Sequence, residues 1–199
     1  MKEIEILKII KEDILRILSE REKTTFNILE EEIKASRSFI LKAIQKLVDE
    51  NLIQKENSFL KLTTIGKEKG ENILRKHLVI ENYFKKSTTE KEAHEKANLL
   101  EHYISEEVIN NIKELSTFKE KEVVPLINIE LHKDRLITNI SISDDELFER
   151  IISMGIVPGE KIKMINKISD GVIVKIENKK FAIDKQIVKN IKVLEHGKA

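Results

Sequence analysis

The chain has 199 residues, of which 40% are hydrophobic and 36% are charged, and its formal net charge is +1. These values exclude a disordered chain and a polyelectrolyte, so any nucleic-acid binding must come from local charge rather than from the total. The absence of cysteine excludes disulfides, thiolate zinc sites, iron–sulfur clusters and cysteine nucleophiles, which leaves nitrogen and oxygen donors for any metal.

No apolar run approaches the roughly 20 residues that are needed to span a bilayer. The N-terminal stretch MKEIEILKIIKED is charged throughout and lacks the apolar core of a signal peptide. We therefore expect a cytoplasmic protein that does not associate with a membrane.

The N-terminal third has the pattern of a small DNA-binding fold. Residues 2–22 repeat apolar side chains at intervals of three and four, which predicts a helix. A short helix with Asn27 at its N-cap follows, and a third helix is expected over residues 36–50. Residues 54–66 alternate like two strands around a turn. Three helices followed by a β-hairpin are the order of a winged helix-turn-helix, which we assign to residues 1–65.

Charge is unevenly distributed within this segment. Residues 34–69 carry eight Lys or Arg against four Asp or Glu, whereas residues 1–33 carry six against nine. The outward residues of helix 36–50 are cationic or hydroxylic, as are the side chains that contact phosphates and base edges of duplex DNA. An ordinary solvated helix face is the alternative. The predicted DNA-binding residues are Ser36, Arg37, Ser38, Lys42, Lys46, Lys55 and Lys61.

Two long helices are expected next, over residues 66–86 and 89–115. Both are apolar on more than one side, and a winged helix is too small to cover that much apolar surface. Exposed apolar helix faces of this size indicate a subunit interface. We assign residues 66–118 to a helical dimerisation domain and expect a homodimer.

Histidine and acidic side chains gather on these two helices. His77 and Glu81 share a face at i, i+4, and a second stripe on the next helix has the spacing i, i+4, i+7, i+8. Packed helices that present His and Glu to one another can hold a metal ion with nitrogen and oxygen donors, although each stripe could also be a solvated face. The second stripe consists of His94, Asn98, Glu101 and His102.

The chain contains no HExxH, P-loop or GxGxxG motif, and no catalytic triad can be inferred. The two histidines of HEKANLLEH are eight residues apart, which does not fit the zinc-protease pattern. We therefore expect a protein that is not an enzyme.

The C-terminal part changes character. Residues 119–138 are mixed and charged, include Pro125, and resemble a linker. Residues 139–199 contain one short helix and then alternating strands separated by turn residues, which predicts a small β-barrel. The expected fold class is mainly α with small β parts.

These segments together resemble the DtxR/MntR family of iron- or manganese-dependent transcriptional regulators. The residues that carry the resemblance are RKH at 75–77 with Glu81, AHEKANLLEH at 93–102, and the Ser105 and Glu106 that follow. The C-terminal MGIVPGEKIKM resembles the SH3-like FeoA barrel of longer family members.

The resemblance implies a role for each matched residue. His77, Glu81 and His94 correspond to one metal site, and Glu101 and His102 to ligands of a second, regulatory site. Asp13 on the first helix aligns with a ligand of manganese-type members.

The sequence departs from the family at two positions. Asn98 stands where members usually have Cys or Glu, so we expect weaker metal affinity there or a site shifted toward His77. Arg16, close to Asp13, would disfavour a two-metal cluster.

The resemblance and the residues together imply a repressor of metal-uptake genes that binds a two-fold DNA operator as a dimer when Fe(II) or Mn(II) is bound. Two alternatives remain: a winged-helix regulator that metal does not control, and a protein-interaction module that uses the FeoA-like barrel.

Overall fold

The computed structural model describes residues 3–115 and 123–195. The chain divides into two compact units, Met1–Leu78 and Val79–Ala199, and each is described by itself. Within the described residues, none of the helices combines the length and the apolar character that crossing a membrane requires.

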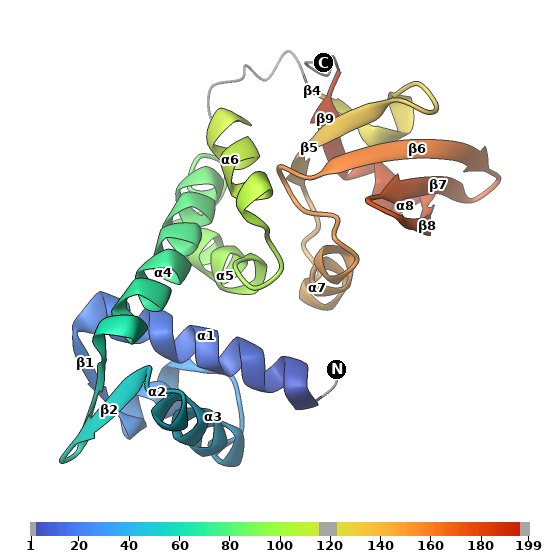
Figure 1. The fold of residues 1–199 in the computed structure, drawn as a ribbon. Coiled ribbons are helices and arrows are strands. Elements are labelled where there is room, and N and C mark those ends of the chain that lie inside the picture. Colours follow the sequence, from blue (N-terminus) through green and yellow to red (C-terminus); the bar gives the residue numbers. More distant parts are fainter. Residues whose placement is uncertain (1–2, 116–122, 196–199) are drawn as a thin grey trace. The chain divides into compact units, whose positions relative to one another are not determined.

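The first unit is a winged helix-turn-helix, as expected. Its core is formed by apolar side chains such as Ile14, Leu18, Ile40 and Leu47, which are fully or almost fully buried. The hairpin and a third strand form an antiparallel sheet in the order β1-β3-β2. Figure 1 labels β1 and β2 of this sheet. Its elements are α1 (Glu3–Arg21), β1 (Lys23–Thr25), α2 (Phe26–Glu32), α3 (Arg37–Asp49), β2 (Ile53–Glu56), β3 (Phe59–Leu62) and the start of α4 (Thr64–Phe84).

The expectation that Asn27 caps the second helix is wrong, because α2 begins at Phe26 and Thr25 occupies the N-cap position. The residues before it pair with β3, Thr24 opposite Leu60. Two consecutive β-branched threonines favour this extended backbone, and the helix therefore starts directly after them.

The second unit combines a helical part with a six-stranded antiparallel sheet in the order β4-β9-β5-β6-β7-β8. The two parts share one apolar core, in which Phe84 and Leu100 belong to the same buried cluster as Ile137 and Phe148. After α4, its elements are α5 (Glu90–Leu100), α6 (Glu106–Leu115), β4 (Val123–Pro125), η2 (Leu126–Asn128), β5 (Asp134–Ile140), α7 (Asp145–Ser153), β6 (Lys161–Ile168), β7 (Gly171–Ile176), β8 (Lys179–Asp184), α8 (Lys185–Lys189) and β9 (Ile191–Leu194).

The single helix expected over residues 89–115 is wrong, because α5 ends at Leu100 and α6 begins at Glu106. The hydroxyl of Ser105 accepts a hydrogen bond from the Val108 amide, and its carbonyl accepts one from Ile109. Ser105 therefore acts as the N-cap of a new helix, a local role that the uninterrupted apolar pattern concealed.

The stretch expected as a linker, residues 119–138, contains β4 and most of β5 in its described part, whereas residues 119–122 lie outside the described residues. Val124 pairs with Val193 and Ile137 also pairs with Val193, on opposite sides of β9. The sheet therefore starts before residue 139, and residues 123–138 complete it with its edge strand β4.

Tyr83 connects the helical part to the sheet within this unit, because its hydroxyl donates a hydrogen bond to the Thr138 carbonyl. Burial raises the pKa of Tyr83 to about 12, so the phenol stays protonated and can donate at any physiological pH.

Candidate metal centre and nucleic-acid interface

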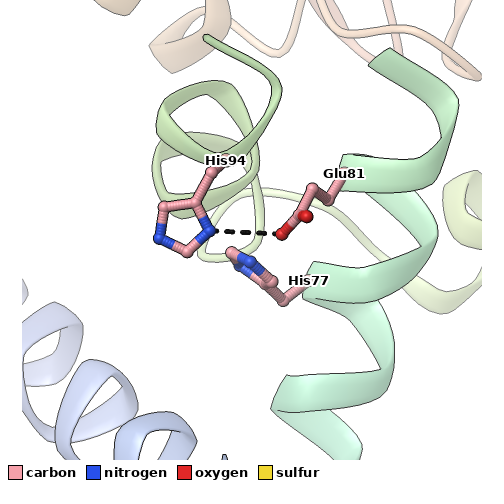
Figure 2. A group of neighbouring side chains, drawn as sticks. All are labelled: His77, Glu81 and His94. Atoms are coloured by element: carbon pink, nitrogen blue, oxygen red, sulfur yellow. Dashed lines mark hydrogen bonds and ion pairs between the residues drawn. The ribbon is translucent and has the colours of Figure 1, made fainter. Parts of the chain in front are cut away.

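Helices α4 and α5 position the first group of candidate ligands. His77 and Glu81 lie one turn apart on α4 and project toward His94 on α5 (Figure 2). The start of α5 is set by a capping box, in which Thr89 accepts from the Glu92 amide and the Glu92 carboxylate accepts from the Thr89 amide. The boundary between the two units falls after Leu78, inside α4, so His77 is held next to Glu81 by the continuity of that helix.

The carboxylate of Glu81 is the centre of this group. Its Oε2 lies 3.2 Å from His94 Nδ1, and its Oε1 lies 2.6 Å from Lys85 Nζ. The hydrogen bond to Glu81 raises the pKa of Lys85. One possible ligand atom from each of His77, Glu81 and His94 lies within 4.8 Å of the other two. Two imidazoles and one carboxylate at this spacing are a donor set that suits Mn²⁺, Fe²⁺ or Zn²⁺.

The second group begins one turn further along α5. The Oδ1 of Asn98 is buried, and it accepts no hydrogen bond from any of the described residues. A buried carbonyl oxygen without a partner is costly, and a bound cation would satisfy it. Glu101 caps the end of α5, and His102 Nε2 lies 3.7 Å from its carboxylate with both side chains buried. These three residues offer an amide oxygen, a carboxylate and an imidazole nitrogen, which are donor types that divalent metal ions accept, and their assignment as ligands stays a prediction.

Asp13 lies on α1 in the first unit, and its assignment as a ligand stays a prediction. The predicted interference from Arg16 must be revised, because this buried guanidinium lies 2.8 Å from the carboxylate of Glu20. The ion pair compensates its charge locally, so Arg16 repels a nearby cation less than an unpaired arginine would.

Helix α3 presents the predicted DNA-binding residues on its solvent face. Ser36 is its N-cap, with its hydroxyl 3.1 Å from that of Ser38. The side chains of Arg37, Ser38, Lys42 and Lys46 are exposed.

Acidic neighbours hold two of these cations. Arg37 lies 3.0 Å from the Glu30 carboxylate and over the ring of Phe26. Lys42 donates a hydrogen bond to Glu3, which lowers the pKa of the Glu3 carboxyl. These exposed pairs are weak and would exchange readily for phosphate.

The two lysines predicted on the hairpin lie on adjacent strands. Lys55 is exposed on β2, whereas Lys61 on β3 is half-buried and donates to Glu56. Assignment of both as DNA contacts stays a prediction.

One residue of the α3 face was not among those predicted. Leu41 is 49% exposed, one turn after Arg37 and one turn before Gln45. Helical spacing alone would have found it, because 37, 41 and 45 share one side of a helix.

Three family models match the chain. Residues 6–79 match the N-terminal domain of the methanogenesis regulatory protein FilR1. Residues 63–122 match the iron dependent repressor, metal binding and dimerisation domain, and residues 124–195 match the FeoA domain. The iron dependent repressor model covers all residues of both candidate metal groups except Asp13.

Several solved structures are similar to this chain over nearly its whole length, but their sequence identity to it is low. The chain is similar to T. acidophilum IdeR, with 21% identity over 98% of this chain and 99% of that one and a TM-score of 0.44. A manganese-dependent transcriptional repressor in complex with manganese has 18% identity over 94% and 100% of the chains, with a TM-score of 0.48. The manganese regulator SloR has 19% identity over 94% and 98%, with a TM-score of 0.47.

The family models, not these structures, carry the assignment. A repressor-type metal-binding and dimerisation domain is followed directly by a FeoA domain, in the order that the motifs at 75–81, 93–102 and 154–164 predict. The chain therefore carries an iron dependent repressor-type metal binding and dimerisation domain followed by a FeoA domain, the two domains that its resemblance to the DtxR/MntR regulators implies.

Proposed function

We propose that the protein is a metal-responsive transcriptional repressor that binds a two-fold DNA operator as a homodimer when Fe(II) or Mn(II) is bound. One observation carries the proposal. The Asn98 oxygen, which accepts no hydrogen bond from the described residues, lies one helical turn from His94, and His94 forms a cluster of possible metal ligands with His77 and Glu81. The segment that holds these residues matches a metal-binding and dimerisation domain. The protein would act by binding rather than by catalysis, in the cytoplasm, where its DNA target is.

Two ions are proposed for each chain. His77, Glu81 and His94 would hold one ion, and this ion would compete with Lys85 for the carboxylate of Glu81. The metal supplies a concentrated positive charge that offsets the carboxylates and holds donors from separate helices together. The second ion would be held by Asn98, Glu101 and His102, with Asp13 as a further ligand.

The domain assignment gives this second ion a mechanical role. We assign DNA binding to residues 1–65 and dimerisation to residues 66–118, with a FeoA-like domain that begins at β4 rather than at residue 139. A ligand from Asp13 would connect the DNA-binding domain to the dimerisation domain through the metal. Half-sites of a two-fold operator are about 34–36 Å apart, or a multiple of this, so a fixed relation between the domains would favour the dimer form that fits DNA. Metal binding would then shift the population toward that form.

An anaerobic titration of the metal-free protein with Mn²⁺ and Fe²⁺, counting ions per chain, tests the proposal. Two ions are expected for the wild type. His94→Ala should lose one ion, and Asn98→Ala should weaken the other. His132→Asn is the matched control, because His132 has a φ of 63° that Asn tolerates and it belongs to neither group.

DNA binding is measured in parallel on an operator-like duplex, with metal and with chelator. Equal DNA affinity with metal and with chelator would mean that the protein is a winged-helix regulator that metal does not control. No DNA binding in either condition would refute the proposal.

A further inference from the structure

The exposed apolar side chain in the middle of α3 has no role in the metal switch or in phosphate contact. Resting on the proposed DNA-binding function, we propose that Leu41 reads the 5-methyl group of a thymine in each operator half-site, with Gln45 reading an adenine close by. Leu41 would thus determine sequence preference, whereas the cations around it determine affinity.

The surroundings of Leu41 favour DNA as its partner. Among the described residues of α3, it is the only large apolar side chain that is exposed. Its exposed neighbours at three and four residues along the helix are Arg37, Ser38 and Gln45, and Lys42 is adjacent. An apolar protein surface would have to cover these polar and cationic groups as well. The major groove offers instead a single methyl group among acceptor edges and flanking phosphates, which complements this arrangement.

The position of Gln45 on α3 predicts which base should lie close to the thymine that Leu41 contacts. Its side chain is exposed, and its Nε2 donates to Asp49 Oδ1 at 2.8 Å, an exposed contact within α3 that a base edge can replace. Gln pairs through two hydrogen bonds with adenine N6 and N7. Positions 41 and 45 are separated by about 6 Å of helix rise, and base pairs stack about every 3.4 Å. The thymine and the adenine should therefore lie within about two base-pair steps of each other.

The size of the effect follows from one methyl group. Burying a CH₂ or CH₃ group contributes about 0.8 kcal/mol, which corresponds to about fourfold in affinity for each half-site and about fifteenfold for a dimer that reads both. Replacing thymine by deoxyuracil removes this methyl group and leaves every hydrogen-bonding edge unchanged. The base substitution is therefore a specific probe of Leu41.

The experiment begins with the full-length protein in Mn²⁺ and a duplex library containing a random 20-base-pair segment. The wild type and Leu41→Ala are each used to select sequences, and the dissociation constant of each is then measured on the wild-type-selected duplex. Each thymine is replaced in turn by deoxyuracil. Leu131→Ala is the matched control, because Leu131 is similarly exposed, at 40%, but lies between η2 and β5. A thermal melt of each variant verifies that the fold is retained.

The inference predicts one thymine per half-site at which deoxyuracil weakens binding of the wild type and of Leu131→Ala about fourfold, and has no effect on Leu41→Ala. Equal deoxyuracil effects for the wild type and Leu41→Ala at every position would overturn it. So would a loss of affinity in Leu41→Ala that is the same for all sequences, because Leu41 would then support the helix rather than read a base. If the wild type enriches no sequence at all, the proposed DNA-binding function itself fails.

Discussion

Gly159 is the point at which α6 of the repressor-type domain meets the FeoA domain, and its substitution tests whether these two domains form one body. Gly159 has a φ of +85° and its carbonyl accepts a hydrogen bond of 2.8 Å from Asn111 on α6. A Cβ added there would lie 2.7 Å from the Val108 carbonyl and 2.8 Å from Ile112 Cγ1. The Val108 carbonyl belongs to the backbone, so that contact cannot relax without moving α6.

Gly155 provides an internal reference in the same domain. It has the same φ of +85°, but a Cβ there would only meet Ile176 Cγ2 at an ordinary 3.6 Å. Gly155→Ala should therefore cost only the left-handed backbone, about 1–2 kcal/mol of unfolding free energy. Gly159→Ala should cost the same amount plus about 1–3 kcal/mol for the overpacked contact with α6.

Urea unfolding followed by circular dichroism measures both costs, and a thermal melt provides a second readout. The apparent Tm of Gly159→Ala should lie below that of Gly155→Ala by roughly 2–12 °C for a chain of this length. Equal destabilisation of the two variants would refute the reasoning, because it would mean that α6 does not pack on Gly159. A double variant with Asn111→Ala should show a coupling energy, since the two residues are in direct contact.

Three further predictions follow from individual side chains. Lys46→Ala should weaken binding to all DNA sequences, and the slope of log affinity against log salt concentration should become less steep by about 0.9 per chain, or about 1.8 per dimer. Binding assays at several salt concentrations measure this slope, and an unchanged slope would exclude a phosphate contact by Lys46. Asn98→Asp places a negative charge at the unpartnered oxygen and should tighten Mn²⁺ binding by on the order of tenfold in calorimetry, whereas unchanged affinity would remove Asn98 from the site. Burial raises the pKa of Glu160 above its ordinary value of 4.5, so its contribution to stability is fully present below pH 4.5 and is lost as the pH rises through the folded-state value. Glu160→Gln should therefore become more stable relative to the wild type between about pH 4 and pH 7, and a difference independent of pH in urea unfolding would contradict this.

Local patterns predicted the elements of the first unit well. The apolar spacing of α1, α3 and α4 and the turn of the β2–β3 hairpin depend on neighbours a few residues away, which a sequence displays directly. The pattern did not show β1, because a three-residue strand is defined by pairing with β3 and has almost no periodicity of its own. The same reason explains why β4 looked like part of a linker, since only its pairing with β9 makes it a strand.

The break between α5 and α6 has a different cause. Residues 101–105 continue the apolar spacing of a helix, and no Gly or Pro interrupts them. Ser105 ends the pattern by capping the next helix, an interaction that competes with continuation by only a small free energy. Tertiary packing therefore decides which of the two local conformations is used.

Some features of the candidate sites can likewise be predicted from the sequence, and others depend on the folded structure. Composition and the 3.6-residue helical period were enough to predict the donor types, the absence of thiolate ligands, the spacing of His77 and Glu81 on one helix face, and the cationic face of α3. Folding was needed to bring His94 to Glu81 and to bury Asn98 Oδ1 where it accepts no hydrogen bond from the described residues. These facts depend on which helix faces pack against one another, and packing is a property of the whole core rather than of any local stretch.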